Sequence, residues 1–248
     1  MASGNTGIIK TKNRIHKQNN LNLSLLFMKR SIIFFSLILI FHFVYACSSD
    51  KGDIKNRVNN TSFGGNPRIL ITYFTEPETG GTDASSGASR IIINNKVMGN
   101  VEYIAKIIQE ATNGDSFRLQ TKKPYPDNHK ALVDLASLEK KSEKRPELYA
   151  KPDSIVNYDI IFVGYPIWWS DMPMLLYTFL EEYDLKDKII IPFSTHGGSG
   201  LSGTVERIEE IQKKASVTTG YTISRDNMSS PRESVMEWLR RLGFSFNQ

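Results

Sequence analysis

The stretch Tyr158–Trp169, Y-D-I-I-F-V-G-Y-P-I-W-W, decides the fold of this chain. Residues 160–163 are apolar without a break, and they lack the alternation of a strand that has one face in water. Such a run is typical of a strand covered on both faces of a parallel sheet. Gly164 and Pro166 are predicted to stop the run. The sequence therefore predicts a central strand with large apolar side chains just beyond its carboxyl end.

Trp168 and Trp169 are predicted to lie in the loop after this strand. In open α/β sheets, ligands bind at the carboxyl ends of the strands, near the point where the strand order reverses. Two indoles at that edge suit a planar aromatic ligand, because stacking contributes roughly 0.5–1.5 kcal/mol beyond the area buried. Taken alone, such a pair more often packs in the core under the following helix. Two further loops decide between these readings in favour of a ligand.

The chain from Arg68 onward alternates between strand and helix patterns. Strands are predicted at 68–75, 116–121, 158–163, 188–194 and 217–223, and helices at 101–112, 128–141, 173–180, 204–215 and 230–243. Pro192 inside the fourth strand predicts a bulge or a strand end. Strict alternation of this kind predicts a doubly wound parallel sheet in a single domain, residues 68–248.

The charge of the chain is concentrated in its first 46 residues. The whole chain has a formal net charge of +5, but residues 1–46 hold six basic residues and no acidic residue. The remainder has 25 basic residues against 26 acidic residues, a balance of −1. This balance argues against a nucleic-acid partner, which requires a clustered basic face.

Residues 1–46 have the parts of an export signal. Met28 to Arg30 form a charged start, residues 31–45 an apolar core, and Ala46 precedes Cys47, the single cysteine of the chain. The apolar run is shorter than the ~20 residues that a membrane-spanning helix needs, so a cleaved signal with translation starting at Met28 is expected. V-Y-A-C resembles the cleavage box of bacterial lipoproteins, in which the cysteine is lipidated. An uncleaved anchor or a plain secretory signal is the alternative.

Residues 47–67 follow as a polar segment rich in Ser, Asn, Asp and Gly, which predicts a flexible tether. With the leader, this organisation predicts an exported protein held at a membrane by the lipid on Cys47. The membrane on which the lipid sits is left open by the sequence.

Three predicted loops open on the same carboxyl edge of the sheet. The first joins Thr75 to a helix that starts near Gly99 and Asn100, where free backbone N–H groups favour a phosphate. The second holds the two tryptophans. The third is T-H-G-G-S-G, residues 195–200, whose glycines let backbone N–H groups approach a ligand. An N-cap or a simple turn explains the first or third loop alone, so the joint occurrence is the signal.

The chain resembles the flavodoxin-like proteins over Arg68–Gly243, in the branch that contains lipoproteins and reductases. Its most specific pieces are G-Y-P-I-W-W with the following M-P, and T-H-G-G-S-G. The resemblance implies a five-stranded parallel sheet of order 2-1-3-4-5, helices on both faces, and FMN as cofactor. It assigns Thr75, Gly99, Asn100 and Val101 to the phosphate, Pro166, Ile167, Trp168 and Trp169 to one side of the isoalloxazine, and Thr195, His196, Gly197, Gly198 and Gly200 to its polar edge.

The sequence departs from the short phosphate loop of small flavodoxins. Residues 76–98 are inserted before Gly99, and Asn94-Asn95 within them predicts a hairpin turn. Val101 also stands where a hydroxyl is usual. Ser85, Ser86 and Arg90 are candidates to bind phosphate or to shape a substrate pocket. Our hypothesis is that Arg90 or Ser86 replaces the missing donor; the alternative is a surface hairpin.

The expected activity is that of an FMN-dependent oxidoreductase. The chain holds no H-E-x-x-H, C-x-x-C or G-x-S-x-G, so no metal site or nucleophile is predicted. His196 is the candidate catalytic residue, to stabilise charge or donate a proton. Electrons would pass from NAD(P)H or a membrane-bound redox partner to a quinone-like or protein acceptor. An electron carrier without turnover is the alternative, and so is a binding module that has lost the flavin, although the balance of −1 favours the enzyme.

Overall fold

The computed structural model describes residues 67–77 and 90–246. The predictions for the leader, Cys47, the tether, Ser85 and Ser86 fall outside these residues. Within them, no helix is long and apolar enough to cross a membrane.

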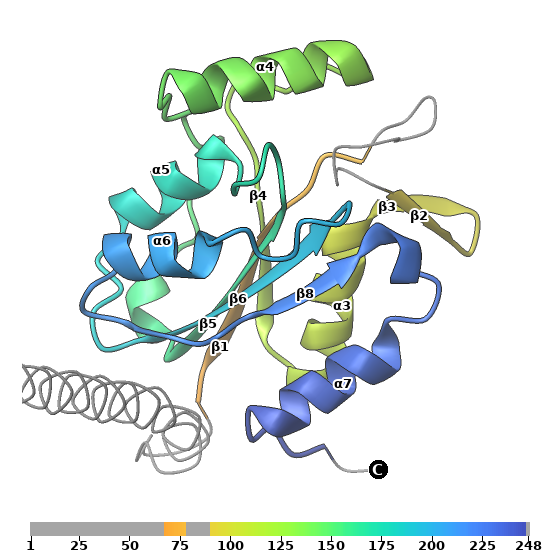
Figure 1. Ribbon diagram of the computed structural model, residues 1–248. Coiled ribbons are helices and arrows are strands. Elements are labelled where there is room, and N and C mark those ends of the chain that lie inside the picture. The colour runs from red at the N-terminus through yellow and green to blue at the C-terminus, as the bar shows by residue number, and fades with distance from the viewer. Residues whose placement is uncertain (1–66, 78–89, 247–248) are drawn as a thin grey trace, which may run out of the picture. The chain divides into compact units, whose positions relative to one another are not determined.

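A parallel sheet forms the centre of the domain (Figure 1). Its strands are β1 (Ile69–Phe74), β4 (Asp115–Leu119), β5 (Ile160–Pro166), β6 (Ile189–His196), β7 (Ser216–Val217) and β8 (Tyr221–Ser224). The order is β4-β1-β5-β6-β7, and β8 also pairs with β6. Because β4 is the second parallel strand of the chain, this arrangement confirms the predicted order 2-1-3-4-5.

Helices cover both faces of the sheet. They are α3 (Asn100–Thr112), α4 (His129–Lys141), α5 (Met174–Glu182), α6 (Thr204–Ile211) and α7 (Arg232–Arg241), with short 3-10 turns at Ile155–Asn157 and Arg225–Asn227. Figure 1 shows α3 and α7 on one face, and α5 and α6 on the other with α4 beyond them. α3 buries one apolar stripe, as the periodicity predicted, whereas α5 is buried on nearly all sides. α4 leaves Leu138, part of its predicted apolar side, 62% exposed, and α6 ends at Ile211 instead of at residue 215.

The central strand is longer than its sequence predicted. All seven residues of β5 are buried, and the strand continues through Gly164 to Pro166 instead of ending at Val163. Gly164 lies opposite Phe193 of β6, and a side chain at position 164 would overlap that ring. The glycine therefore makes room for a core aromatic residue and does not break the strand.

Although the sequence predicted a bulge or a strand end at Pro192, this residue does not end its own strand, and the interruption lies in the neighbouring edge strand. β6 runs through Pro192 to His196, whereas the single edge strand predicted at 217–223 is two strands, β7 and β8, separated by residues 218–220. The carbonyl of Ile190 faces this edge, since it accepts a hydrogen bond from Thr218 N–H. The backbone of Pro192, two residues further along β6, faces the same edge, but proline has no N–H to donate. The pairing of β6 with the edge is therefore interrupted between β7 and β8.

A separate antiparallel hairpin precedes α3. β2 (Arg90–Ile93) pairs with β3 (Lys96–Gly99), as the Asn94-Asn95 signal predicted. Both asparagines have positive φ, 50° and 60°, which is the backbone of a type I′ hairpin turn.

Candidate flavin site

The three predicted loops meet at one edge of the sheet. β1, β5 and β6 are adjacent and parallel, with Tyr73 opposite Gly164, and Pro166 opposite Thr195. The second and third loops are also joined directly, because Ile167 N–H donates to the carbonyl of Thr195 at 2.8 Å. The carboxyl edge therefore collects the groups that the sequence assigned to it.

The start of α3 lies against the end of β1. Gly99 is the N-cap of α3, and no side chain caps the helix there. A Cβ on Gly99 would overlap Oγ1 of the buried Thr75. Only glycine permits this close approach, which leaves the free N–H groups of the first helical turn open to an anion.

Asn100 and Val101 contribute in different ways. Asn100 is buried, and its Oδ1 has no hydrogen-bond partner among residues 67–77 and 90–246. A buried carbonyl oxygen without a donor is costly, so the position suits a ligand that brings a hydroxyl. The Val101 side chain belongs to the core at 1% exposure, so only its backbone can face a phosphate.

The hairpin brings Arg90 to the same place. Arg90 pairs with Gly99 in the register of β2 and β3, and cross-strand partners present their side chains on the same face of a hairpin. Of the two residues proposed to replace the missing phosphate donor, Arg90 is therefore beside the helix start, while Ser86, like the nearby Ser85, lies outside the described residues.

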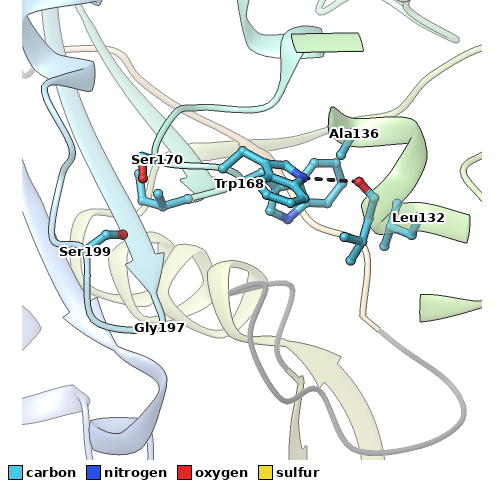
Figure 2. A pocket seen from close by; sticks show the side chains of 9 residues that line it. Leu132, Ala136, Trp168, Ser170, Gly197 and Ser199 are labelled. Carbon is cyan, nitrogen blue, oxygen red and sulfur yellow. Dashed lines mark hydrogen bonds between the residues drawn. The ribbon is translucent and has the colours of Figure 1, made fainter. Parts of the chain in front are cut away.

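A cavity of about 320 Å³ opens between the second and third loops and α4. Figure 2 shows Leu132 and Ala136 on one side, Ser170, Gly197 and Ser199 on the other, and Trp168 between them. Ligand pockets of proteins span roughly 300–1,000 Å³. The lining residues are Leu132, Val133, Ala136, Ile167, Trp168, Trp169, Ser170, Gly197 and Ser199.

The two tryptophans of the second loop have separate roles. Trp168 is 5% exposed and packs edge-to-face on Phe74 and Tyr125, with ring centroids 5.3 and 5.5 Å away. It is a core residue that also forms the cavity wall. Trp169 is 53% exposed and donates from Nε1 to the carbonyl of Val133 at 3.2 Å. Of the two indoles, Trp169 has the larger accessible surface for a ligand.

The third loop holds its histidine in one tautomer. His196 Nδ1 accepts a hydrogen bond from Gly198 N–H at 2.8 Å, so the neutral ring carries its proton on Nε2. Burial lowers the pKa of His196 and the charge of Asp226 opposes this. Gly198 and Gly200 have φ of 132° and 62°, which side chains rarely adopt. The arrangement offers a neutral imidazole N–H donor next to Gly197, which lines the cavity.

Several predicted residues lie beside the cavity and do not line it. Pro166 and Thr195 are buried at the strand ends, and His196, Gly198 and Gly200 are outside the lining set. The sequence did not single out Ser170 or the three lining residues of α4, and it included Ser199 only as part of the 195–200 loop. The apolar stripe of the 128–141 helix included Leu132 and Ala136, but a stripe does not reveal whether it faces a core or a cavity.

The family follows from a comparison of the whole sequence. Residues 91–242 match the model of the family described as flavodoxin, which is more than half of the chain. The chain belongs to the flavodoxin family. Family membership confirms FMN as the expected cofactor, and with it a general redox role. The uncapped start of α3, the Gly99–Thr75 approach and the unpartnered Asn100 Oδ1 fit that group.

Solved structures of flavoproteins are similar to this flavodoxin. One from Bacteroides uniformis is 28% identical, with a TM-score of 0.53, over 71% of this chain and 99% of that chain. One from Bacteroides eggerthii is 22% identical, with a TM-score of 0.53, over 73% and 100%. One from Lactobacillus acidophilus, solved in complex with FMN, is 19% identical, with a TM-score of 0.48, over 70% and 99%. No curated protein matches significantly.

Proposed function

We propose that this flavodoxin is an FMN-dependent oxidoreductase that takes electrons from NAD(P)H or a redox partner and passes them to a quinone-like or protein acceptor. Bound FMN supplies the electron chemistry, since a flavin exchanges electrons singly or in pairs. The protein binds it, orients it and controls access of water and protons.

The observation that carries this proposal is the alignment of two half-sites on one sheet edge. The uncapped N-terminus of α3 lies against the end of β1, and the cavity lies between the loops after β5 and β6. The first suits a phosphate and the second suits a planar ring. A ligand that occupies both sites has to carry a phosphate and a planar ring, as FMN does.

Residue roles follow from the atoms available. The backbone N–H groups at the start of α3 would hold the phosphate, and Asn100 Oδ1 would accept from a ribityl hydroxyl. Trp169 and Gly197 would contact the ring from opposite loops. His196, with its proton on Nε2, would donate toward the polar edge of the ring.

We further propose that the protein works outside the cytoplasm, held to a membrane through lipid on Cys47. The support is the leader pattern of residues 28–47. Nicotinamide cofactors are expected to be scarce there, so a membrane-bound donor is the preferred source of electrons. Metabolic labelling with a radioactive fatty acid tests this, because Cys47→Ser should abolish incorporation.

The deciding experiment is an absorption spectrum of the full chain in detergent, followed by titration with FMN and FAD. Visible flavin bands and preferential binding of FMN are expected, followed by NADH or NADPH oxidation that depends on an added quinone. Reduction of the bound flavin only by protein partners would indicate a carrier. A colourless chain that binds neither flavin would indicate a binding module and contradict the proposal.

A further inference from the structure

The loop after β5 contains a tight turn with strained backbone. Trp168 and Asp171 exchange two backbone hydrogen bonds, Trp168 N–H to Asp171 O at 2.8 Å and Asp171 N–H to Trp168 O at 3.0 Å. The two residues between them, Trp169 and Ser170, have φ of 52° and 57°. This is the backbone of a type I′ turn, which favours Asn and Gly, so a tryptophan there must be held by its surroundings.

The side chain of Asp171 provides that hold. It is a buried carboxylate whose Oδ1 accepts from Met172 N–H at 2.9 Å and from the Tyr177 hydroxyl at 3.0 Å. Two cations face it: Lys140 Nζ is 3.4 Å from Oδ2, and Arg207 Nε is 3.6 Å from Oδ1. A buried charge with this many partners is tolerated, and removing it leaves two cations uncompensated.

Each cation also binds a backbone carbonyl of a loop at the cavity. Lys140, in the last turn of α4, donates to the carbonyl of Trp169 at 2.6 Å. Arg207, in α6, donates from Nη1 to the carbonyl of Ser202 at 3.0 Å. Asp171 therefore joins α4, the turn 168–171 and the loop before α6, which are the three parts of the chain that enclose the cavity.

We infer that Asp171 is a positioning residue for the flavin ring: through Lys140 and Arg207 it sets the separation of the two loops and holds the Trp169 indole at the cavity. The inference rests on the proposed function for the identity of the ligand. The network is made by groups of the protein alone, so it can be tested with and without flavin.

Acrylamide quenching of tryptophan fluorescence tests the network without flavin. Trp168 and Trp238 are both 5% exposed, so quenching in the folded protein reports mainly on Trp169. Asp171→Ala, Lys140→Met and Arg207→Met should each change the quenching constant, and Lys140→Arg should restore the value of the parent chain. Lys151→Met is the matched control, because it removes an ion pair with Glu182 at the other end of α5.

FMN affinity tests the positioning itself. We expect the Kd for FMN to rise about tenfold in Asp171→Ala, the scale typical of residues coupled in one network. Asp171→Asn keeps an acceptor for Met172 and Tyr177 but loses the charge, so its Kd should be intermediate. The double variant Asp171→Ala/Lys140→Met should bind about as well as the poorer single variant.

The outcomes separate this inference from the proposed function. Unchanged quenching in all three variants, or a Kd within twofold of the parent in a folded Asp171→Ala, overturns the positioning role. If the parent chain binds no FMN, the proposed function fails, while the quenching arm still decides whether the network holds the turn. If Asp171→Ala does not fold, Lys140→Met and Arg207→Met give both readouts.

Discussion

At the scale of single residues, Gly99 lies so close to Thr75 that a Cβ at position 99 would overlap the Thr75 Oγ1. The backbone of Gly99 has φ of −69°, which any residue adopts, so the requirement for glycine is steric alone.

We therefore predict that Gly99→Ala weakens FMN binding by at least about tenfold, since displaced backbone donors lose charge-assisted hydrogen bonds of roughly 1.5–3 kcal/mol. Titration of the apo protein with FMN measures the loss. The overlap with Thr75 Oγ1 should also lower the free energy of unfolding of Gly99→Ala. Adding Thr75→Ala removes Oγ1 and should recover much of that free energy. A Gly99→Ala chain with unchanged Kd would show that the start of α3 does not contact the phosphate.

The protonation of His196 gives a second prediction at this scale. Burial lowers its pKa, and protonation of Nδ1 would also break the bond from Gly198 N–H. Because the folded pKa lies below the unfolded value, the unfolded chain takes up the proton first as the pH falls. Its contribution to stability is therefore full above the unfolded pKa of about 6.5 and is lost below it.

His196→Gln should thus lose less stability between pH 7 and pH 5 than the parent chain, by a few tenths of a kcal/mol because the ring is partly exposed. Urea unfolding at both pH values measures this, and NMR titration gives the pKa directly. A pKa above 6.5 in the apo protein would contradict the prediction.

At the scale of elements, the contact of β5 with β6 depends on Gly164. A methyl group there would overlap the ring of Phe193, which is fully buried. We predict that Gly164→Ala destabilises the domain by about 1–3 kcal/mol through overpacking. Thermal unfolding measures the change. Phe193→Leu in the same chain should recover part of it, and a simple sum of the two losses would argue against a steric cause.

The hairpin of β2 and β3 gives a prediction about its register. Arg90 pairs with Gly99, so the residue lies beside the start of α3. Arg90→Ala should raise the Kd for FMN about tenfold and flatten its dependence on salt, because a charge-assisted contact is lost. Lys96→Ala, at the turn end of the hairpin, is the control and should leave the Kd unchanged. An unchanged Kd in Arg90→Ala as well as in Lys96→Ala would indicate a surface hairpin without a role in binding.

At the scale of the whole molecule, ligand binding and stability are linked. A ligand that binds only the folded chain stabilises it by RT ln(1 + [L]/Kd), about 2.7 kcal/mol when the ligand is at 100 times its Kd. We predict that FMN raises the melting temperature in this way and that riboflavin, which lacks the phosphate, raises it less. Equal shifts with both would place the binding energy in the ring cavity alone.

The sequence by itself determined the architecture. A parallel strand that is buried on both faces has to be apolar throughout and has to be followed by a crossover helix, so the runs and stripes from Arg68 onward indicate a doubly wound parallel sheet. The order of its strands was implied by the family resemblance and not by these patterns. The carboxyl ends of such strands lie at one edge of the sheet, so the sequence alone predicted that Thr75, the tryptophan loop and the glycine loop lie together.

Only the tertiary structure decided how neighbouring residues differ. Trp168 and Trp169 are chemically identical, yet one is core and the other is exposed, because Trp169 is a central residue of the strained turn that reverses the chain between Trp168 and Asp171. Pro192 interrupts the strand beside it and not its own. The Lys140–Asp171–Arg207 network joins three elements distant in sequence. Local patterns encode which side of an element is apolar, whereas the partner that covers it depends on long-range packing.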